Sequence, residues 1–142
     1  MNQGYRKTED WKRGGKDFLV VVNHHTSATP AEFACGEGPH RWCVYAYIYP
    51  GHPHFEAFDG TEAMWQDAAT VLPMHGGPSL LRVHTKHPDH AITSYQVGAD
   101  YNHLHDDEYK HMANEIEAAS VFRDADELFD WLSAKAQEVA AK

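Results

Sequence analysis

Alternating hydrophobic and polar positions along the chain predict several β-strands. The clearest alternation covers residues 40–49 (HRWCVYAYIY), where successive side chains point to opposite faces. One face would consist of Trp42, Val44, Ala46 and Ile48, and the other of Cys43, Tyr45, Tyr47 and Tyr49. Residues 16–23 form a β-branched run, and residues 79–86 and 90–97 are two further candidates. Proline at the second position of His87–His90 predicts a type I turn between these last two strands.

A C-terminal helix is predicted from apolar residues that recur at helical spacing. These residues are Ala125, Leu128, Phe129, Leu132, Ala136 and Val139. Asp124 can cap the first turn, and Glu127 follows three residues later. Thr61 is a second capping candidate and predicts a shorter helix over roughly 61–69.

Residues 108–113 (EYKHMA) allow two interpretations, because they alternate as in a strand but also begin an apolar pattern of helical spacing. We prefer a fifth strand. Asn114 and Glu117 form a capping-box pattern, which would start a helix only after this segment.

These elements predict an α+β fold: an antiparallel sheet of about four to five strands that carries the C-terminal helix and one or two short helices on one face. The length of 142 residues suits a single domain over 1–142. The N-terminal segment 1–13 is mostly polar, and we expect it to be flexible. The predicted core lies between sheet and helix and consists of Phe18, Val20, Val22, Trp42, Val44, Ile48, Leu81, Val83, Ile92, Leu128, Phe129 and Leu132.

Composition and charge narrow the functional classes. The formal net charge is −9, and residues 100–130 carry ten Asp/Glu against two Lys/Arg. This balance argues against direct nucleic-acid binding, which needs basic surface, and is compatible with a basic protein partner. No apolar run approaches the ~20 residues of a membrane span. The polar N-terminus and the presence of only two cysteines favour a reduced, cytoplasmic protein without a disulfide framework.

The twelve histidines raise the question of a metal. In VGADYNHLHDD, residues 97–107, His103 and His105 would point the same way on an extended segment, and Asp107 could be a third ligand for zinc. His84 and His90 lie near the ends of the two predicted strands that flank the turn, and they could share an ion. The plainer interpretation of both groups is polar loop and turn chemistry, so we expect no cofactor and keep zinc as the alternative.

A third group combines Cys35, His40 and Cys43 with His24 or His25, but its C-x4-H-x2-C spacing lacks the tight pair of a zinc knuckle. The chain also contains no nucleophile-elbow motif, and MHGGPS, residues 74–79, lacks the lysine of a phosphate loop. The motif evidence leaves enzymatic activity uncertain and favours a protein that is not an enzyme.

Aromatic residues beside prolines give a more informative pattern. The segment YIYPGHPHFEAF presents large, rigid side chains of the kind that are enriched at protein interfaces. Together with nearby acidic residues they form the candidate partner-binding set: Tyr47, Tyr49, His54, Phe55, Phe58, Asp100, Asp106 and Asp107. The alternative is that Phe55, Phe58 and Trp65 pack into the edge of the core.

Five segments together resemble short single-domain proteins of bacteriophages and mobile elements of proteobacteria. These segments are DFLVVVNHH, GPHRWCVYAYIYP, MHGGPS, VGADYNHLHDD and VFRDADELFDWL. The resemblance implies a small accessory protein in the cytoplasm of a bacterial host cell, acting by binding a host component such as a defence or nucleic-acid-handling complex. The leading hypothesis is therefore an acidic anti-defence or accessory protein that binds another protein. The alternative is a small histidine-rich metal-binding protein or metal-dependent hydrolase.

Overall fold

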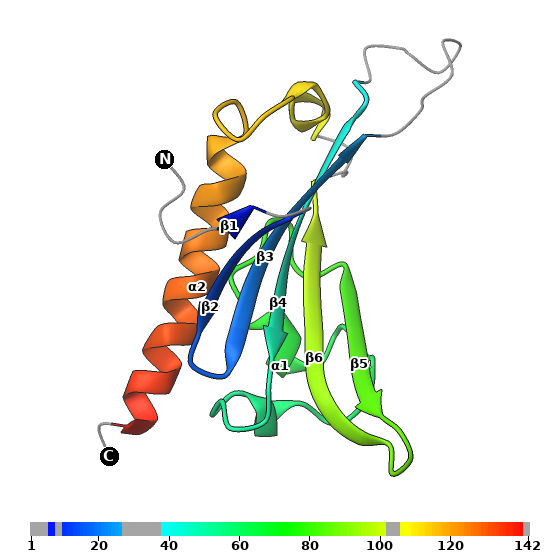
Figure 1. The fold of residues 1–142 in the computed structure, drawn as a ribbon, viewed down its shortest axis with the longest axis vertical. Helices are drawn as coiled ribbons and strands as arrows, with labels where there is room; N and C mark the ends of the chain where they lie inside the picture. Colours follow the sequence, from blue (N-terminus) through cyan, green and yellow to red (C-terminus); the bar gives the residue numbers. More distant parts are fainter. Residues whose placement is uncertain (1–5, 8–9, 27–37, 102–105, 141–142) are drawn as a thin grey trace.

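The computed structural model describes residues 6–7, 10–26, 38–101 and 106–140. Within these ranges, six strands form one antiparallel sheet in the order β1-β2-β3-β4-β6-β5 (Figure 1). The strands are β1 (Arg6–Lys7), β2 (Trp11–Gly15), β3 (Phe18–Thr26), β4 (His40–Ile48), β5 (Leu80–Lys86) and β6 (Ala91–Asp100). The last four correspond to the four strands predicted with most support. The predicted α+β class is confirmed.

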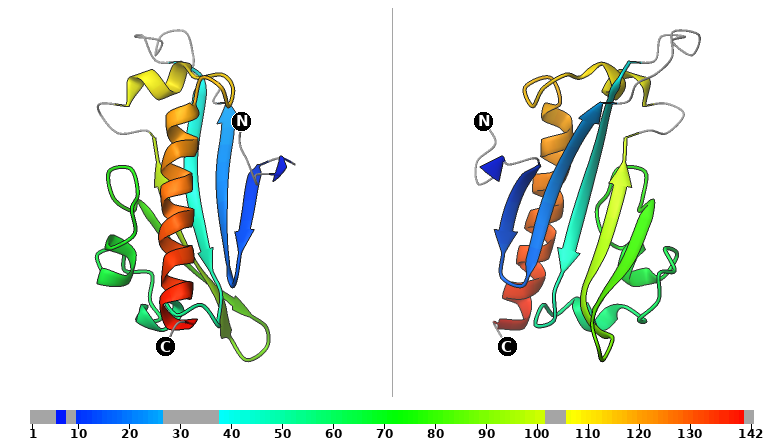
Figure 2. Two further views of the ribbon diagram at one scale, coloured as in Figure 1. Left: turned by 90° about the vertical axis from the view of Figure 1, so that its left-hand side faces the viewer. Right: turned by 45° about the vertical axis from the view of Figure 1, so that its right-hand side comes forward.

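All helical elements lie on one side of the sheet (Figure 2). They are η2 (Phe55–Ala57), α1 (Asp67–Thr70), η3 (Asp107–His111) and the long helix α2 (Ala119–Ala140). The alternation in β4 explains this arrangement, because its buried side chains all point toward α2. The facing helix residues are also buried: Val121, Phe122, Ala125, Leu128 and Leu132.

The core between sheet and α2 closely follows the prediction. Nine of the twelve predicted residues are buried: Phe18, Val20, Val22, Trp42, Val44, Ile48, Leu81, Leu128 and Leu132. The other three, Val83, Ile92 and Phe129, are partly buried and pack against this cluster. The period of each element, two in strands and 3.6 in the helix, was sufficient to identify them.

The N-terminal segment corrects one expectation. Residues 1–13 were expected to be flexible, but Trp11 begins β2, pairs with Val22 of β3 and is only 5% exposed. Its indole stacks on Trp42 at 5.7 Å between ring centroids. Burial of an aromatic side chain outweighs the polar composition around it. Residues 1–5 and 8–9 lie outside the described residues.

The predicted fifth strand over 108–113 is wrong, because most of this segment forms η3. Tertiary contacts decide its conformation: the ring of Tyr109 packs against Tyr101 at 4.8 Å, and the Met112 carbonyl accepts a hydrogen bond from Trp42 Nε1 at 3.0 Å. Two aromatic residues distant in sequence thus fix a segment whose local pattern allowed either structure.

The start of α2 also differs from the prediction. The helix begins at Ala119, so Asp124 lies inside it and does not cap it. Only half of the predicted capping box forms: the Glu117 N–H donates to Asn114 Oδ1 at 2.9 Å, but Glu117 Oε1 accepts from the Ala113 N–H at 3.0 Å and not from that of Asn114. It shapes the turn that leads into α2.

Two further local predictions are corrected. Helix α1 is shorter than the predicted helix over 61–69, because Thr61 does not cap it and instead bonds to Asp59 through its N–H and its hydroxyl. The connection between β5 and β6 is not a type I turn, since the His87–Pro88 peptide bond is cis and His90 has a φ of 59°.

Candidate protein-binding surface

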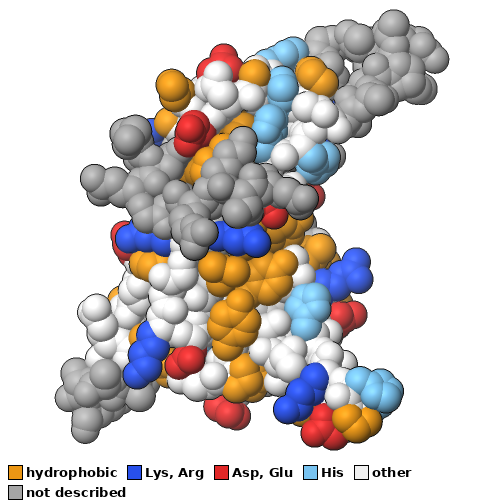
Figure 3. Space-filling view, viewed as in Figure 1, with side chains coloured by type: hydrophobic (Ala, Val, Ile, Leu, Met, Phe, Trp, Pro, Cys, Tyr) orange, Lys and Arg blue, Asp and Glu red, His pale blue; other side chains and the backbone are white. Residues whose placement is uncertain are grey.

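The face of the sheet opposite α2 carries a group of tyrosines and aliphatic side chains. Figure 3 shows hydrophobic side chains gathered over the middle strands, with Lys or Arg and His side chains around them. The half-buried members, called here the tyrosine face, are Leu19, Tyr45, Tyr47, Tyr49 and Leu80. Lys12, Arg82 and His84 are exposed and frame it. The helical elements of the described residues lie on the other side of the sheet.

Strand register places these side chains in rows. One row runs across five strands as Lys12, Val21, Tyr45, Gly98 and Leu80. The next row consists of Gly14, Leu19, Tyr47, Gln96 and Arg82. Because neighbouring side chains in a row are about 5 Å apart, the face is a continuous surface and not a set of isolated residues.

Tyr45 is held against the sheet. A Cβ atom on Gly98 would lie 2.5 Å from Cδ1 of the Tyr45 ring, so only glycine lets the ring rest on this part of β6. Burial raises the pKa of the Tyr45 phenol above its ordinary value, and the neighbouring Cys43 adds to the rise. Burial likewise raises the pKa of Tyr47. Both phenols therefore stay neutral at physiological pH, which suits contact with another protein.

The side chain of His84 contacts the tyrosine face. Its ring stacks against Tyr47 at 6.0 Å, and its Nε2 lies 2.7 Å from Gln96 Oε1. His90 instead packs against His87 at 6.1 Å. These contacts place His84 on the strand and His90 in the turn that follows β5.

The other proposed metal groups find no support in the described part of the chain. His103 and His105 lie outside the described residues, and the side chain of Asp107 is not described. His24 Nε2 lies 2.9 Å from His40 Nδ1, a hydrogen-bond distance. Among the residues that the structure describes, no group of three or more His, Cys, Asp or Glu side chains could hold an ion.

The loop after β4 packs into the core edge, so part of the predicted partner-binding set is wrong. His54 is 8% exposed, and its Nε2 lies 2.7 Å from the Ala68 carbonyl oxygen. Burial lowers the pKa of His54. Phe58 is 7% exposed and stacks on Tyr95 at 4.3 Å, while Phe55 packs against the same ring at 5.1 Å. These residues stabilise the loop instead of presenting a binding surface.

His52, another residue of the segment YIYPGHPHFEAF, fixes the same loop. The ring is 2% exposed, its Nδ1 accepts a hydrogen bond from the His54 N–H at 3.0 Å, and its Nε2 lies 3.0 Å from the Leu132 carbonyl oxygen. With Nδ1 as the acceptor, Nε2 is the donor to that carbonyl. The two prolines that flank His52 in the sequence indicate a rigid loop, but they do not indicate which of its side chains are buried.

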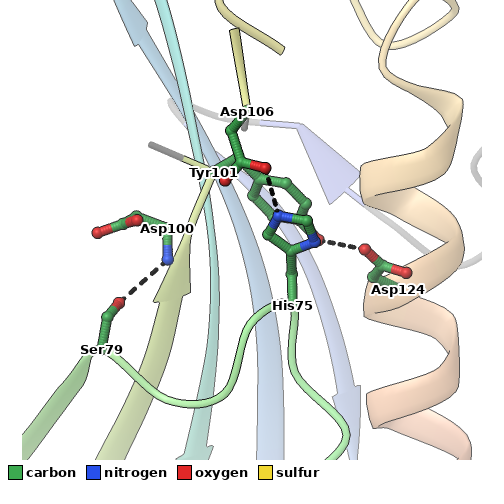
Figure 4. A network of polar contacts seen from close by, with 6 residues as sticks. All are labelled: His75, Ser79, Asp100, Tyr101, Asp106 and Asp124. Atoms are coloured by element: carbon green, nitrogen blue, oxygen red, sulfur yellow. Dashed lines mark hydrogen bonds and ion pairs between the residues drawn. The ribbon is translucent and has the colours of Figure 1, made fainter. Parts of the chain in front are cut away.

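A second polar cluster, also missed from the sequence, joins β6 to α2 (Figure 4). His75 Nε2 lies 2.8 Å from Asp106 Oδ1, and the Tyr101 hydroxyl donates to Asp124 Oδ2 at 2.6 Å. The His75 ring stacks on Tyr101 at 4.3 Å. Tyr101 is buried on the same side as Val97 and Ala99. Because the predicted strand ended at residue 97, the sequence did not indicate that Tyr101 is buried.

This cluster has the histidine–carboxylate geometry of a general base, but its surroundings favour a structural role. Asp106 is 5% exposed and its Oδ1 lies within hydrogen-bond distance of His75 Nε2, which corrects its predicted place on a binding surface. The adjoining pocket of about 200 Å³ is lined by Pro73, Met74, His75, Asp124 and Glu127, none of which carries a thiol or an alcohol nucleophile. The hydrogen bonds tie four chain segments together.

Two acidic residues of the predicted binding set, Asp100 and Asp106, lie on opposite sides of the sheet. Asp100 is half-buried at the end of β6, beside Cys43 on the face that carries the tyrosines. Asp106 is buried on the opposite side of the sheet, with His75. Tyr47, Tyr49 and Asp100 are the members of the predicted set that remain on the open side of the sheet.

Comparisons with protein-family models, curated proteins and solved structures found no match. Of the helices in the described residues, none combines the length and the apolar character needed to span a membrane.

Proposed function

We propose that this protein acts by binding another protein through the tyrosine face. One observation carries the proposal: half-buried tyrosine and aliphatic side chains form continuous rows on the side of the sheet away from α2. Tyrosine is enriched at protein interfaces because it offers a large apolar ring with a polar end and loses little conformational entropy.

The chemistry of the face favours one kind of partner. Lys12 in β2 and Arg82 in the edge strand β5 flank the tyrosines on opposite sides, whereas Asp100 lies at the end of β6. A complementary partner therefore offers an apolar centre, carboxylates opposite the two cations, and a cation opposite Asp100. The resemblance to phage and mobile-element proteins makes a host defence or nucleic-acid-handling complex the partner that we propose.

A nucleic-acid ligand fits this face less well. Single-stranded nucleic acids bind sheets whose aromatic rings expose their flat faces for base stacking. Here the Tyr45 ring rests against Gly98, and the Tyr47 ring stacks on His84. The formal net charge of −9 also opposes phosphate binding.

Site-specific photo-cross-linking in the cells in which the chain naturally occurs tests the proposal. A photoreactive benzophenone amino acid replaces Tyr47 in the full chain, or Asp130 on the exposed side of α2 as a control. We expect discrete protein adducts from position 47 only, and we expect Arg82→Glu to weaken them at least several-fold. Equal labelling from both positions, absence of adducts from position 47, or adducts that nuclease removes would each reject protein binding by this face.

A further inference from the structure

A small pocket opens on the tyrosine side of the sheet, between β4, β6 and the start of β5. It measures about 110 Å³ and is lined chiefly by Cys43, Tyr45, Ser79, Leu80, Gly98 and Asp100. Sites for drug-sized ligands measure ~300–1,000 Å³, so this pocket has room for the end of a single side chain.

The pocket is built by register and by one hydroxyl group. Gly98 stands between Tyr45 and Leu80 in its row, and its missing side chain leaves the floor open. Ser79 Oγ accepts a hydrogen bond from the Asp100 N–H at 3.2 Å, which fixes the start of β5 against the end of β6. The walls therefore come from β4 and β6, from the first residue of β5 and from Ser79 directly before it.

The lining carries one kind of charge. Burial raises the pKa of the Cys43 thiol and of the Tyr45 phenol, so both are neutral at physiological pH. Among the described residues that line the pocket, Asp100 alone carries a carboxylate. Lys12 lies in the same row as Tyr45 but two strands away from it, on the side opposite to Gly98.

We propose that this pocket receives a cationic side chain, the ammonium of a lysine or the guanidinium of an arginine, from the protein partner. The alkyl part would lie against Leu80, and the charge would lie between the Asp100 carboxylate and the Tyr45 ring. An aromatic ring attracts a cation, and a carboxylate forms charge-assisted hydrogen bonds with it. The origin of the side chain rests on the proposed function, whereas the affinity of the pocket for a cation does not.

Cys43 supplies a direct readout, because a molecule in the pocket shields its thiol. The probe is n-butylammonium, which reproduces the end of a lysine side chain, and n-butanol is its neutral counterpart. The full chain, carrying Cys35→Ser so that one thiol remains, is alkylated with uncharged iodoacetamide at increasing probe concentration. We expect n-butylammonium to slow alkylation at least several-fold, with half-protection at millimolar concentration, and n-butanol to have little effect.

Asp100→Asn should raise the half-protecting concentration of n-butylammonium about tenfold or more, because the amide oxygen lacks the negative charge that attracts the ammonium. Each variant is compared with its own rate without probe, since Asp100 also affects the thiol. The unmodified pocket already decides the question: equal protection by both probes, or protection by neither, overturns the proposal. Such a result would leave cross-linking at Tyr47 as a separate test of the proposed function.

Discussion

The contact between Tyr45 and Gly98 makes a sharp prediction about stability. In Gly98→Ala the new Cβ would lie 2.5 Å from Cδ1 and 2.7 Å from Cε1 of the Tyr45 ring. Carbon atoms in contact normally lie ~3.5–4.0 Å apart, so the ring has to move by about 1 Å or more. Overpacking of this kind destabilises a protein by ~1–3 kcal/mol. We expect the free energy of unfolding to fall by about that amount.

Urea unfolding measures this effect against two controls. Gly14→Ala adds the same methyl group to β2, but its nearest neighbour would be Leu19 Cδ1 at 3.9 Å, so stability should change little. In a Tyr45→Ala background the ring is absent, and the penalty of Gly98→Ala should largely disappear. If Gly98→Ala is as mild as Gly14→Ala, or if its penalty persists without the ring, the described packing of Tyr45 is wrong.

Two further predictions concern the core and the buried loop. Leu128→Ala should lower the free energy of unfolding by ~2–5 kcal/mol because the side chain is fully buried. Asp130→Ala on the exposed side of α2 should change it little, and denaturant unfolding compares the two variants. Burial lowers the pKa of His54 below 6.5, so the unfolded chain binds this proton more tightly, and stability should fall as the pH drops below 6.5. Unfolding of His54→Gln at about pH 7.5 and 5.5 should show a smaller fall in stability than unfolding of the wild type.

The strands could be predicted from sequence because burial on one face imposes a period of two. In β4 the alternation from Trp42 to Ile48 matches the observed burial residue by residue. The same holds for the helical period in α2, where Leu128 and Leu132 are fully buried. These patterns are local consequences of a one-sided environment, so they can be read without knowing the partner surface.

The conformations that the sequence did not predict depend on contacts between distant residues. Trp11 stands among charged residues, and its contacts with the distant rings of Trp42 and Phe122 anchor β2 in the sheet. His54 and Phe58 have the composition of an interface, but their neighbours in space are Ala68 and Tyr95. Exposed and buried aromatic loops look alike in sequence, because the difference lies in what the loop packs against.

The pocket could not be predicted from the sequence either, because it depends on the register between β4 and β6. A shift of one residue between β4 and β6 would turn the side chains of one strand to the other face, so burial of Val44 and Ala46 toward α2 fixes the register. That register places Gly98 opposite Tyr45, which faces away from the core. The open floor beside Asp100 is thus a consequence of packing on the opposite side of the sheet. Residue types alone could nominate Tyr47, Tyr49 and Asp100, but only strand pairing brings the carboxylate, the tyrosine ring and the glycine gap together.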